Sequence, residues 1–247
     1  MLSSLELRGQ YDPRIVLDWI RGRRVDGLII AKSQRRERPL LHEALEAQVP
    51  IITVAPDEAV THVHVVRCDN IGGGVAVADH LVELGHRHVA FAGGPPHSLD
   101  SKHRLRGLTE GLARHGIRLD RRKSVFFCTS YESSAGADFA ARFLDKPFEA
   151  TALVMGNDAL ALGFMRVAQQ RGVRVPRDLS IVGFDDVPVG ALLWPGLTTV
   201  GQPMRDMGRA ACRRLFEAIA APGLLETIEY PVSLVVREST GRPRPRK

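Results

Sequence analysis

The sequence of 247 residues predicts an α/β fold built from parallel βαβ units. Short apolar runs, which are typical of buried parallel strands, alternate with segments in which apolar residues recur at helical spacing. Glycine follows several of these helical segments, as it commonly does at helix C-termini. A chain of this length can hold one large lobe or two smaller ones.

The first half of the chain shows this alternation from the N-terminus onward. Asp12-Pro13 is a helix start signal, because proline is favoured at the first helical position. Gly22, Gly85 and Gly116 are the corresponding stop signals. The expected elements are, in order, the end of a strand at Leu5–Leu7, a helix from Asp12 to Ile20, a strand over Val25–Ala31, a helix over Pro39–Ala47, a strand over Pro50–Val54, a helix over Asn70–Leu84, a strand over His88–Ala92 and a helix over Arg104–His115.

The second half continues in the same way. Asn157 stands where a helix begins, and asparagine is a preferred N-cap. Strands joined by helices of this length imply right-handed parallel crossovers. The expected elements are a strand over Val125–Cys128, a helix over Ser133–Leu144, a strand over Ala152–Met155, a helix over Ala159–Gln170, a strand over Leu179–Phe184 and a helix over Asp206–Ile219.

Composition excludes several classes of protein. No apolar run approaches the roughly 20 residues that span a bilayer, so no membrane partner is expected. The N-terminal residues are charged from Glu6 onward and lack the apolar core of a signal peptide, which predicts a cytoplasmic protein. The odd number and wide separation of Cys68, Cys128 and Cys212 indicate reduced thiols rather than disulfides.

The net charge of +6 raises the question of nucleic-acid binding. The densest basic run is the tail, residues 242–247, whose alternating prolines prevent a helix. Short charged termini are usually solvated. A solvated tail is therefore favoured over a DNA contact.

Motifs for catalysis, cofactors or metals are weak. The sequence has no nucleophile elbow, no phosphate-binding loop and no paired cysteine motif, so no enzyme and no cofactor are expected. Gly72–Gly74 could cradle an anion, but the spacing of a dinucleotide-binding glycine motif is lacking, so a flexible helix entry is favoured. His62 with His64 and His86 with His88 have the spacing of one strand face, but no third metal ligand accompanies either pair.

Two adjacent carboxylates, Asp185 and Asp186, follow the apolar run that ends at Phe184. In open α/β sheets ligands bind at the carboxyl ends of the strands. The carboxylates are therefore well placed to accept hydrogen bonds from hydroxyl or amine groups.

Taken together, the motifs of this chain resemble the effector-binding core of the LacI/GalR family of bacterial transcription regulators, which has a periplasmic-binding-protein-like fold. Each matching motif is weak alone, but together they cover nearly the whole chain in family order. They are Arg24–Ile29, Asp69-Asn70, Gly72-Gly73, His80-Leu81, Leu84–Val89, Arg104 with Gly107, Gly156–Gly163, Val175-Pro176, Val182–Asp186, Leu197–Val200 and Arg237–Thr240.

The resemblance implies two doubly wound parallel-sheet lobes of type I, joined by crossover strands around a cleft. The N-terminal lobe would comprise residues 1–86 and 203–225, and the C-terminal lobe residues 87–202 and 226–241, followed by the basic tail at 242–247. Closure of the cleft on a ligand would reorient the lobes of a homodimer.

Five ligand-binding residues follow from the same resemblance, each beside a structural alternative. Asp185 would accept bonds from ligand hydroxyls, or be a turn residue. Arg104 would fork onto hydroxyls or a carboxylate, or be a solvated charge. Asn157 would face the cleft, or only cap a helix. Tyr131 would stack on a ligand ring, or be a core or surface aromatic. Asp69 would contact ligand or cap the glycine-rich helix, while Asp186 shapes the turn.

The chain departs from the family pattern at its start. Family members carry an N-terminal helix-turn-helix that reads DNA, and none precedes Met1, so operator DNA is expected as a partner only through an element absent from this chain. Leu2–Leu7 matches the second strand of the first lobe, which predicts that the first strand and first helix are lacking. We hypothesise a shortened product or a misplaced start, which the DNA upstream of the start codon would test.

The function expected from the resemblance is the effector-sensing and dimerisation region of a transcriptional repressor. The effector would be a small polar molecule, with a sugar or polyol favoured because Ser98 stands where some members have arginine. The alternative is a free-standing periplasmic-type sugar-binding protein, which a secretion signal upstream would reveal.

Overall fold

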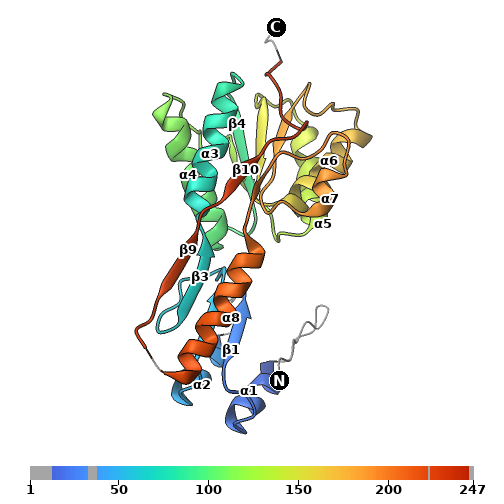
Figure 1. The fold of residues 1–247 in the computed structure, drawn as a ribbon. Coiled ribbons are helices and arrows are strands. Elements are labelled where there is room, and N and C mark those ends of the chain that lie inside the picture. The colour runs from blue at the N-terminus through green and yellow to red at the C-terminus, as the bar shows by residue number, and fades with distance from the viewer. Residues whose placement is uncertain (1–12, 33–37, 222, 245–247) are drawn as a thin grey trace. The chain divides into compact units, whose positions relative to one another are not determined.

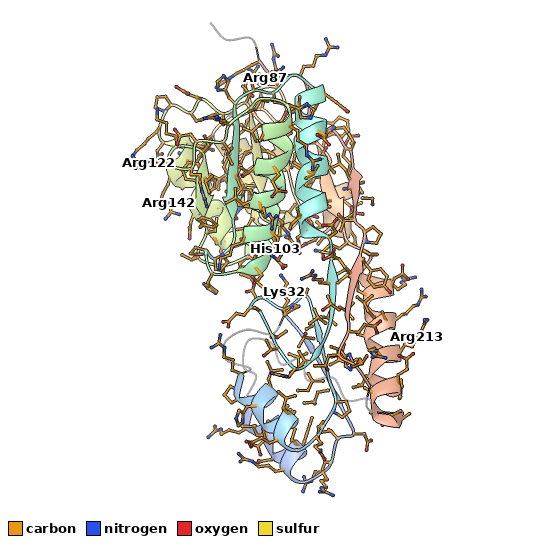
Figure 2. All side chains as sticks on the ribbon, turned by 90° about the vertical axis from the view of Figure 1, so that its left-hand side faces the viewer. Lys32, Arg87, His103, Arg122, Arg142 and Arg213 are labelled. Carbon is orange, nitrogen blue, oxygen red and sulfur yellow. The ribbon has the colours of Figure 1, made fainter. Side chains whose placement is uncertain are left out.

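The computed structural model describes residues 13–32, 38–221 and 223–244. The chain forms two compact units (Figure 1). Unit 1 comprises Met1–Arg67 and Met204–Glu229, and unit 2 comprises Cys68–Pro203 and Tyr230–Lys247. The strand expected at the N-terminus, over Leu2–Leu7, lies outside the described residues. Charged side chains project from both units, among them Arg87, Arg122 and Arg142 of unit 2 and Arg213 of unit 1 (Figure 2).

Unit 1 is built on a four-stranded sheet with the order β1-β2-β3-β9. Neighbours β1, β2 and β3 run parallel, with Leu28 opposite Ile51 and Ile52 opposite His64. Val16 and Ile20 of α1 and Leu40 of α2 are buried in a core with residues of β2 and β3, while α8 packs against β1 and β2. The elements are α1 (Pro13–Arg21), β1 (Leu28–Ala31), α2 (Arg38–Glu46), β2 (Ile51–Val54), β3 (His64–Cys68), α8 (Met204–Ala220) and β9 (Thr227–Tyr230).

Unit 2 is built on a parallel sheet with the order β5-β4-β6-β7. The chain winds from β4 outward to β5 and then returns to β6 on the other side, so the strand order reverses between β4 and β6. A separate antiparallel pair joins β8 to β10. The strands are β4 (Val89–Gly93), β5 (Val125–Phe127), β6 (Ala152–Met155), β7 (Ser180–Val182), β8 (Thr199–Gly201) and β10 (Ser233–Val235).

The helices of unit 2 pack in two pairs, α3 with α4 and α5 with α6. Glycine permits both close approaches, because a Cβ at Gly107 would overlap the carbonyl of Ile71 and one at Gly163 would overlap that of Ser133. The helices are α3 (Asn70–Glu83), α4 (Leu99–Arg114), α5 (Ser133–Leu144), α6 (Asp158–Gln170) and α7 (Pro188–Ala191).

The predicted fold class is confirmed: the chain is α/β with parallel sheets. Strands β9 and β10 were not expected, because β10 has only three residues and β9 alternates exposed with half-buried residues. Of the two histidines expected on one strand face, His64 begins β3 and His62 precedes it. Helix α4 begins at Leu99 instead of Arg104, since its first turn is polar yet buried at Asp100 and Ser101.

The division between the units falls at Arg67–Cys68, whereas the expected lobes divide at residue 86. The difference is α3, which packs along α4 and so belongs with unit 2. No helix in the described ranges is both long and apolar enough to cross a membrane.

Candidate functional site

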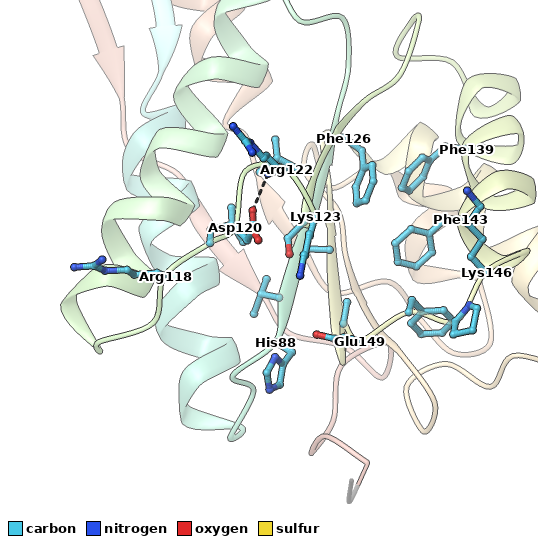
Figure 3. A pocket seen from close by; sticks show the side chains of 18 of the residues that line it. His88, Arg118, Asp120, Arg122, Lys123, Phe126, Phe139, Phe143, Lys146 and Glu149 are labelled. Carbon is cyan, nitrogen blue, oxygen red and sulfur yellow. Dashed lines mark hydrogen bonds between the residues drawn. The ribbon is translucent and has the colours of Figure 1, made fainter. Parts of the chain in front are cut away.

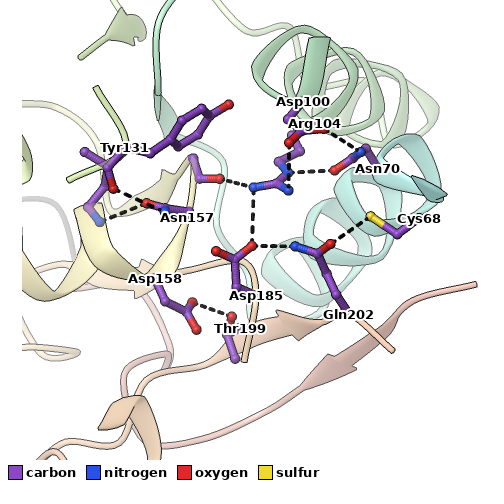
Figure 4. A network of polar contacts seen from close by, with 12 residues as sticks. Cys68, Asn70, Asp100, Arg104, Tyr131, Asn157, Asp158, Asp185, Thr199 and Gln202 are labelled. Carbon is purple, nitrogen blue, oxygen red and sulfur yellow. Dashed lines mark hydrogen bonds and ion pairs between the residues drawn. The ribbon is translucent and has the colours of Figure 1, made fainter. Parts of the chain in front are cut away.

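The carboxyl ends of the strands in unit 2 gather several polar side chains (Figure 4). Asn157 follows β6, Asp185 follows β7, and Arg104 reaches this edge from α4. The strand order reverses between β4 and β6, and such a reversal is where an open α/β sheet leaves a crevice for a ligand. The structure therefore brings four of the expected residues to this edge, namely Arg104, Tyr131, Asn157 and Asp185.

Arg104 is buried, with 4% of its side chain exposed. Its Nε donates a hydrogen bond to Asn70 Oδ1 at 2.7 Å, and its Nη1 donates to the carbonyl oxygen of Gly156 at 2.5 Å. The guanidinium carbon lies 3.7 Å from the centre of the Phe184 ring, a cation–π contact. These contacts hold the planar group in one orientation, so Arg104 is not the solvated helix-start charge of the structural alternative.

Two carboxylates balance the charge of Arg104. Its Nη1 lies 3.7 Å from Asp185 Oδ1, and its Nη2 lies 3.8 Å from Asp100 Oδ2. Burial opposes the charged form, but Asp100 and Asp185 favour it, and the net effect raises the pKa of Arg104. Both separations exceed hydrogen-bond length, so the attraction acts through space.

Asp185 combines an unusual backbone with a partly accessible side chain. Its φ of 125° lies in the left-handed region that favours glycine. A residue in this region costs ~1–3 kcal/mol of backbone strain, and such residues cluster at functional sites. The backbone N–H donates to Val200 O at 2.8 Å, which holds the strained residue in place. The carboxylate accepts from Gln202 Nε2 at 2.5 Å and is 29% exposed.

Gln202 and Cys68 extend the network and were not expected from the sequence. The thiol of Cys68 donates to Gln202 Oε1 at 3.2 Å, which orients the amide so that its nitrogen faces Asp185. Burial raises the pKa of Cys68 to about 11, so the thiol keeps its proton at neutral pH. Cys68 therefore acts as a donor that positions Gln202.

Asn70 and Asp100 were also missed. Asn70 is 6% exposed and connects Asp100 with Arg104. Its Nδ2 donates to Asp100 Oδ1 at 3.1 Å, and its Oδ1 accepts from Arg104 Nε. The spacing of Asp100 and Arg104, four residues apart on one helix, is a signal that could have identified their pairing. No local signal links either residue to Asn70.

Asn157 and Tyr131 lie on the other side of the site. Asn157 Oδ1 caps α6 by accepting from the N–H of Leu160 at 2.9 Å, and its Nδ2 donates to the carbonyl of Tyr131 at 3.3 Å. The hydroxyl of Tyr131 lies 2.8 Å from the hydroxyls of both Ser98 and Ser101. Burial raises the pKa of Tyr131. The helix-capping alternative for Asn157 thus describes a contact that the structure contains.

Asp69 and Asp186 make structural contacts in this unit. Asp69 Oδ1 accepts from the N–H of Gly72 at 2.7 Å, which makes Asp69 the N-cap of α3. Asp186 accepts from Arg237 Nη2 at 2.6 Å, in agreement with its expected role in shaping the turn.

Asp158 is a buried carboxylate that the sequence did not single out. Its Oδ1 accepts from Thr199 Oγ1 at 2.5 Å and its Oδ2 accepts from the N–H of Val187 at 2.8 Å. Burial raises the pKa of Asp158. By tying the segment after β7 to β8, Asp158 holds the backbone that carries Asp185.

The arrangement suits a ligand that both donates and accepts hydrogen bonds. Arg104 and Asn157 supply donors, and Asp185 supplies an accessible acceptor. Among the residues that the structure describes, no group of three or more His, Cys, Asp or Glu side chains could hold a metal ion. The edge thus presents both hydrogen-bond donors and an acceptor.

The sequence comparisons place the chain beside bacterial regulators. A family model described as "Periplasmic binding protein-like domain" matches residues 78–240. The HTH-type transcriptional regulator DegA of Bacillus subtilis is 31% identical over 236 residues, which cover 93% of this chain and 69% of that protein. The regulator CelR of Thermobifida fusca is 34% identical, with 88% and 62% covered. The chain thus spans about two thirds of the length of these relatives.

Solved structures give the same result. A LacI family transcriptional regulator from Enterococcus faecium with bound ribose superposes with a TM-score of 0.82 at 26% identity, covering 93% of this chain and 84% of that one. The CelR–cellobiose complex superposes with a TM-score of 0.84 at 30% identity, covering 92% and 69%. These relatives are regulators of transcription rather than enzymes.

Proposed function

The chain belongs to the LacI family of transcriptional regulators, and we propose that it is the effector-sensing region of a repressor that responds to a sugar. The observation that carries the proposal is the Arg104–Asp185 pair at the carboxyl edge of the unit 2 sheet. A buried, oriented cation beside a partly exposed carboxylate is suited to vicinal hydroxyl groups, each of which donates one hydrogen bond and accepts another.

The geometry of the pair leaves a role for the ligand. At 3.7 Å, Arg104 Nη1 and Asp185 Oδ1 are too far apart for a good hydrogen bond. A ligand hydroxyl that donates to Asp185 and accepts from Arg104 would form two good bonds where the free protein has one long ion pair. The ring of Tyr131, fixed by Ser98 and Ser101, would pack against the sugar ring.

Two relatives support a sugar over a charged ligand. The Enterococcus faecium regulator was solved with ribose and CelR with cellobiose. For this chain the same class of ligand agrees with a site in which Asp100 and Asp185 already balance Arg104. We infer that the sugar, once bound, shifts an equilibrium between two conformations of the chain, to the extent that it binds one of them more tightly.

A homodimer is part of the proposal. The segment around α7 exposes large apolar side chains, with Leu192 83% and Trp194 89% exposed. Aromatic side chains that are exposed in this way are typical of protein interfaces. We expect the regulator to act in the cytoplasm and to reach its operator through a DNA-reading element outside the residues described.

Ligand binding is tested by thermal unfolding of the full chain with a panel of sugars, nucleosides and sugar phosphates. A ligand at 100 times its Kd stabilises the folded state by about 2.7 kcal/mol, which raises the melting temperature measurably. We expect a sugar to give the largest shift. A panel without any shift contradicts the proposed function.

The site is tested with Asp185→Asn, which keeps the size of the side chain and removes its charge. We expect calorimetry to show at least about tenfold weaker binding of the sugar, because a charged acceptor bonds more strongly than a neutral one. The matched control is Asp206→Asn, an exposed carboxylate of unit 1, which should bind like wild type. Equal affinity in the two variants would count against the assigned site.

Regulation and assembly need separate measurements. Deletion of the gene in its host should raise the transcripts of a small set of genes, and addition of the identified sugar to the intact strain should raise the same set.

Analytical ultracentrifugation should show a dimer that Trp194→Arg dissociates, whereas Val236→Asp, at a site 58% exposed, leaves it intact. Unchanged transcripts would contradict repression, and a monomeric wild type would contradict the dimer.

A further inference from the structure

Unit 2 carries a concave region at the opposite ends of the strands from the candidate site. This basic hollow has a volume of about 1070 Å³ and is lined by residues 87–90, 117–120, 122–127, 142–143 and 146–150 together with Phe139 (Figure 3). Its lining includes the residues at which β4 and β5 begin, so it lies at the amino ends of the sheet. It is therefore distinct from the edge that holds Arg104 and Asp185.

The basic hollow concentrates positive charge. Six of its lining side chains are cationic and two, Asp120 and Glu149, are acidic, so its net charge of +4 accounts for most of the +6 of the whole chain. Asp120 Oδ1 is engaged locally, because it accepts from the backbone N–H of Arg122 at 2.9 Å. No salt bridge within the described residues pairs a carboxylate with the cations at the rim, which include Arg122, Lys123, Arg142 and Lys146.

This cluster differs from those exposed arginines of unit 2 that have an acidic partner, as Arg174 has in Asp178 at 2.6 Å and Arg171 has in Asp145 at 2.5 Å. Like charges gathered without partners repel one another and thus cost folding free energy. Because this cluster lowers the stability of the fold, it is a candidate for a function that offsets the loss, namely recognition of an anionic partner.

Phenylalanine rings form one side of the hollow. The ring centres of Phe126 and Phe143 are 5.7 Å apart, and those of Phe143 and Phe148 are 5.1 Å apart. Phe139, only 4% exposed, packs against Phe126 at 5.3 Å and joins the rings to the core of the unit. This side of the hollow is an apolar surface fixed by the core, next to the cationic rim.

An edge strand borders the same region. β5 pairs only with β4 among the described strands, and all three of its residues line the hollow. The outer backbone N–H and C=O groups of an edge strand can pair with an added strand from another chain. This feature points to an extended polypeptide, whose main chain supplies the complementary groups.

The alternatives fit less well. The cations of the hollow are distributed around a wide rim, whereas a small-molecule site has a few converging polar groups. Nucleic acid would match the charge, but it offers no main-chain N–H and C=O groups that could extend the sheet at the edge of β5. A polypeptide uses the charges, the apolar side and the strand edge together.

We propose that the basic hollow is a docking site for an extended acidic segment of a partner protein. The segment pairs with the outer edge of β5, places carboxylates against Arg122, Lys123, Arg142 and Lys146, and packs one apolar side chain against Phe126 and Phe143. Carboxylates two residues apart on such a strand point to the same side, which matches a rim that carries several cations.

The test uses the full chain and three fluorescein-labelled heptapeptides, followed by fluorescence anisotropy. The acidic probe is EDVFVDE, the charge-reversed probe is KKVFVKK, and the probe without apolar residues is EDGSGDE. We expect saturable binding of EDVFVDE that weakens as ionic strength rises, at least about tenfold weaker binding of EDGSGDE, and no binding of KKVFVKK. The absence of saturable EDVFVDE binding below about 1 mM would overturn the proposal.

Variants locate the binding. The triple variant K123E/R142E/K146E should lose EDVFVDE binding by at least about tenfold, because three exposed cations become anions. The matched control K102E/R166E/R177E makes the same charge change at exposed positions of unit 2 outside the hollow and should bind like wild type. Circular dichroism establishes that both variants are folded. Equal loss in the two triple variants would reduce the effect to net charge and overturn the site.

Two further measurements separate the alternatives. Hydrogen exchange should slow at the outer amides of β5 when EDVFVDE is bound, as strand addition requires. Single-stranded and duplex oligonucleotides should not displace the peptide at equal concentration. Unchanged exchange at β5, or displacement by an oligonucleotide that K123E/R142E/K146E no longer binds, would assign the hollow to another kind of partner.

Discussion

Basic side chains lie in opposite environments at the two ends of the unit 2 sheet. At the carboxyl ends, Arg104 is buried, hydrogen-bonded to Asn70 and Gly156 and flanked by two carboxylates. At the amino ends, Lys123 and Lys146 are exposed at the rim of the basic hollow. A buried cation requires compensation because desolvation is costly, whereas an exposed cation keeps its hydration and can bind an anion from elsewhere.

This contrast has a consequence for function. The compensated cation is part of the folded network, so any ligand that binds there must replace or tighten contacts that already exist. The exposed cations keep their hydration in the folded chain and contribute to association through charge complementarity. The first arrangement favours selectivity for a small ligand, and the second favours a partner that brings several negative charges.

Replacement of Arg104 is the change with the largest expected effect. Arg104→Met keeps much of the apolar contact with Phe184 but removes the cation that lies between Asp100 and Asp185. Loss of one partner from a buried ion pair costs ~3–5 kcal/mol, so urea unfolding should show a loss of this size. The exposed control Arg106→Met should change stability by no more than ~0.5 kcal/mol. A similar, small effect at both positions would remove the contrast between the two ends.

Gln202→Ala should have the next largest effect. The change removes the donor to Asp185 Oδ1 and the acceptor for the thiol of Cys68. Loss of such partly buried hydrogen bonds costs ~1–3 kcal/mol. Denaturant unfolding measures this loss, and calorimetry should show weaker sugar binding as well. A variant that loses stability but binds sugar normally would place Gln202 outside the ligand site.

His86→Gln should alter the dependence of stability on pH. Burial lowers the pKa of His86 below its ordinary 6.5, and both ring nitrogens are engaged, with Thr151 Oγ1 at 2.8 Å and Gly241 O at 2.9 Å. The unfolded chain therefore binds the proton more readily, so stability present above about pH 6.5 is lost as the pH falls below it. Wild type should lose up to about 1 kcal/mol between about pH 7 and about pH 5.5 through this group.

The same unfolding series on the variant measures the contribution of His86. His86→Gln should show a smaller loss over this pH range, while the exposed control His97→Gln should follow wild type. Identical pH profiles for wild type and His86→Gln would show that the folded chain does not hold His86 neutral.

Lys146→Glu should have the smallest effect on stability. The side chain is exposed and has no carboxylate partner among the described residues, and reversal of its charge reduces the positive surplus of the hollow. Thermal unfolding should change by no more than the equivalent of ~0.5 kcal/mol, in either direction. A large loss of stability would show that the hollow is part of the structural framework rather than a surface for a partner.

Sequence reasoning succeeded where the signal is local. Buried strands such as Ile51–Val54 and Ala152–Met155 are continuous apolar runs, and helices such as Ser133–Leu144 have regular spacing and clear ends. It missed β9, because a short strand with exposed alternate residues has little pattern. It also missed the first turn of α4, where Asp100 and Ser101 are polar yet buried.

The candidate site shows the same limit. Arg104, Asn157 and Asp185 follow from motifs, and the structure brings them to one edge. Asn70 and Asp158 lie within matched motifs but were assigned no role, and Gln202 lies in none, since what these residues do depends on partners distant in the chain. The cations of the basic hollow are similarly spread over several segments, and in the sequence they look like ordinary surface charges.

The order of residues alone determines the α/β class, the family and the position of Asp185 after a buried strand, because hydrophobic periodicity and short motifs are properties of neighbouring residues. Tertiary structure decides which charges are buried and paired and which remain exposed, because burial and pairing depend on segments that only the fold brings together. In the sequence, Arg104 begins one expected helix and Lys146 follows the end of another. Only the fold makes one the centre of a compensated network and the other part of an open, positively charged surface.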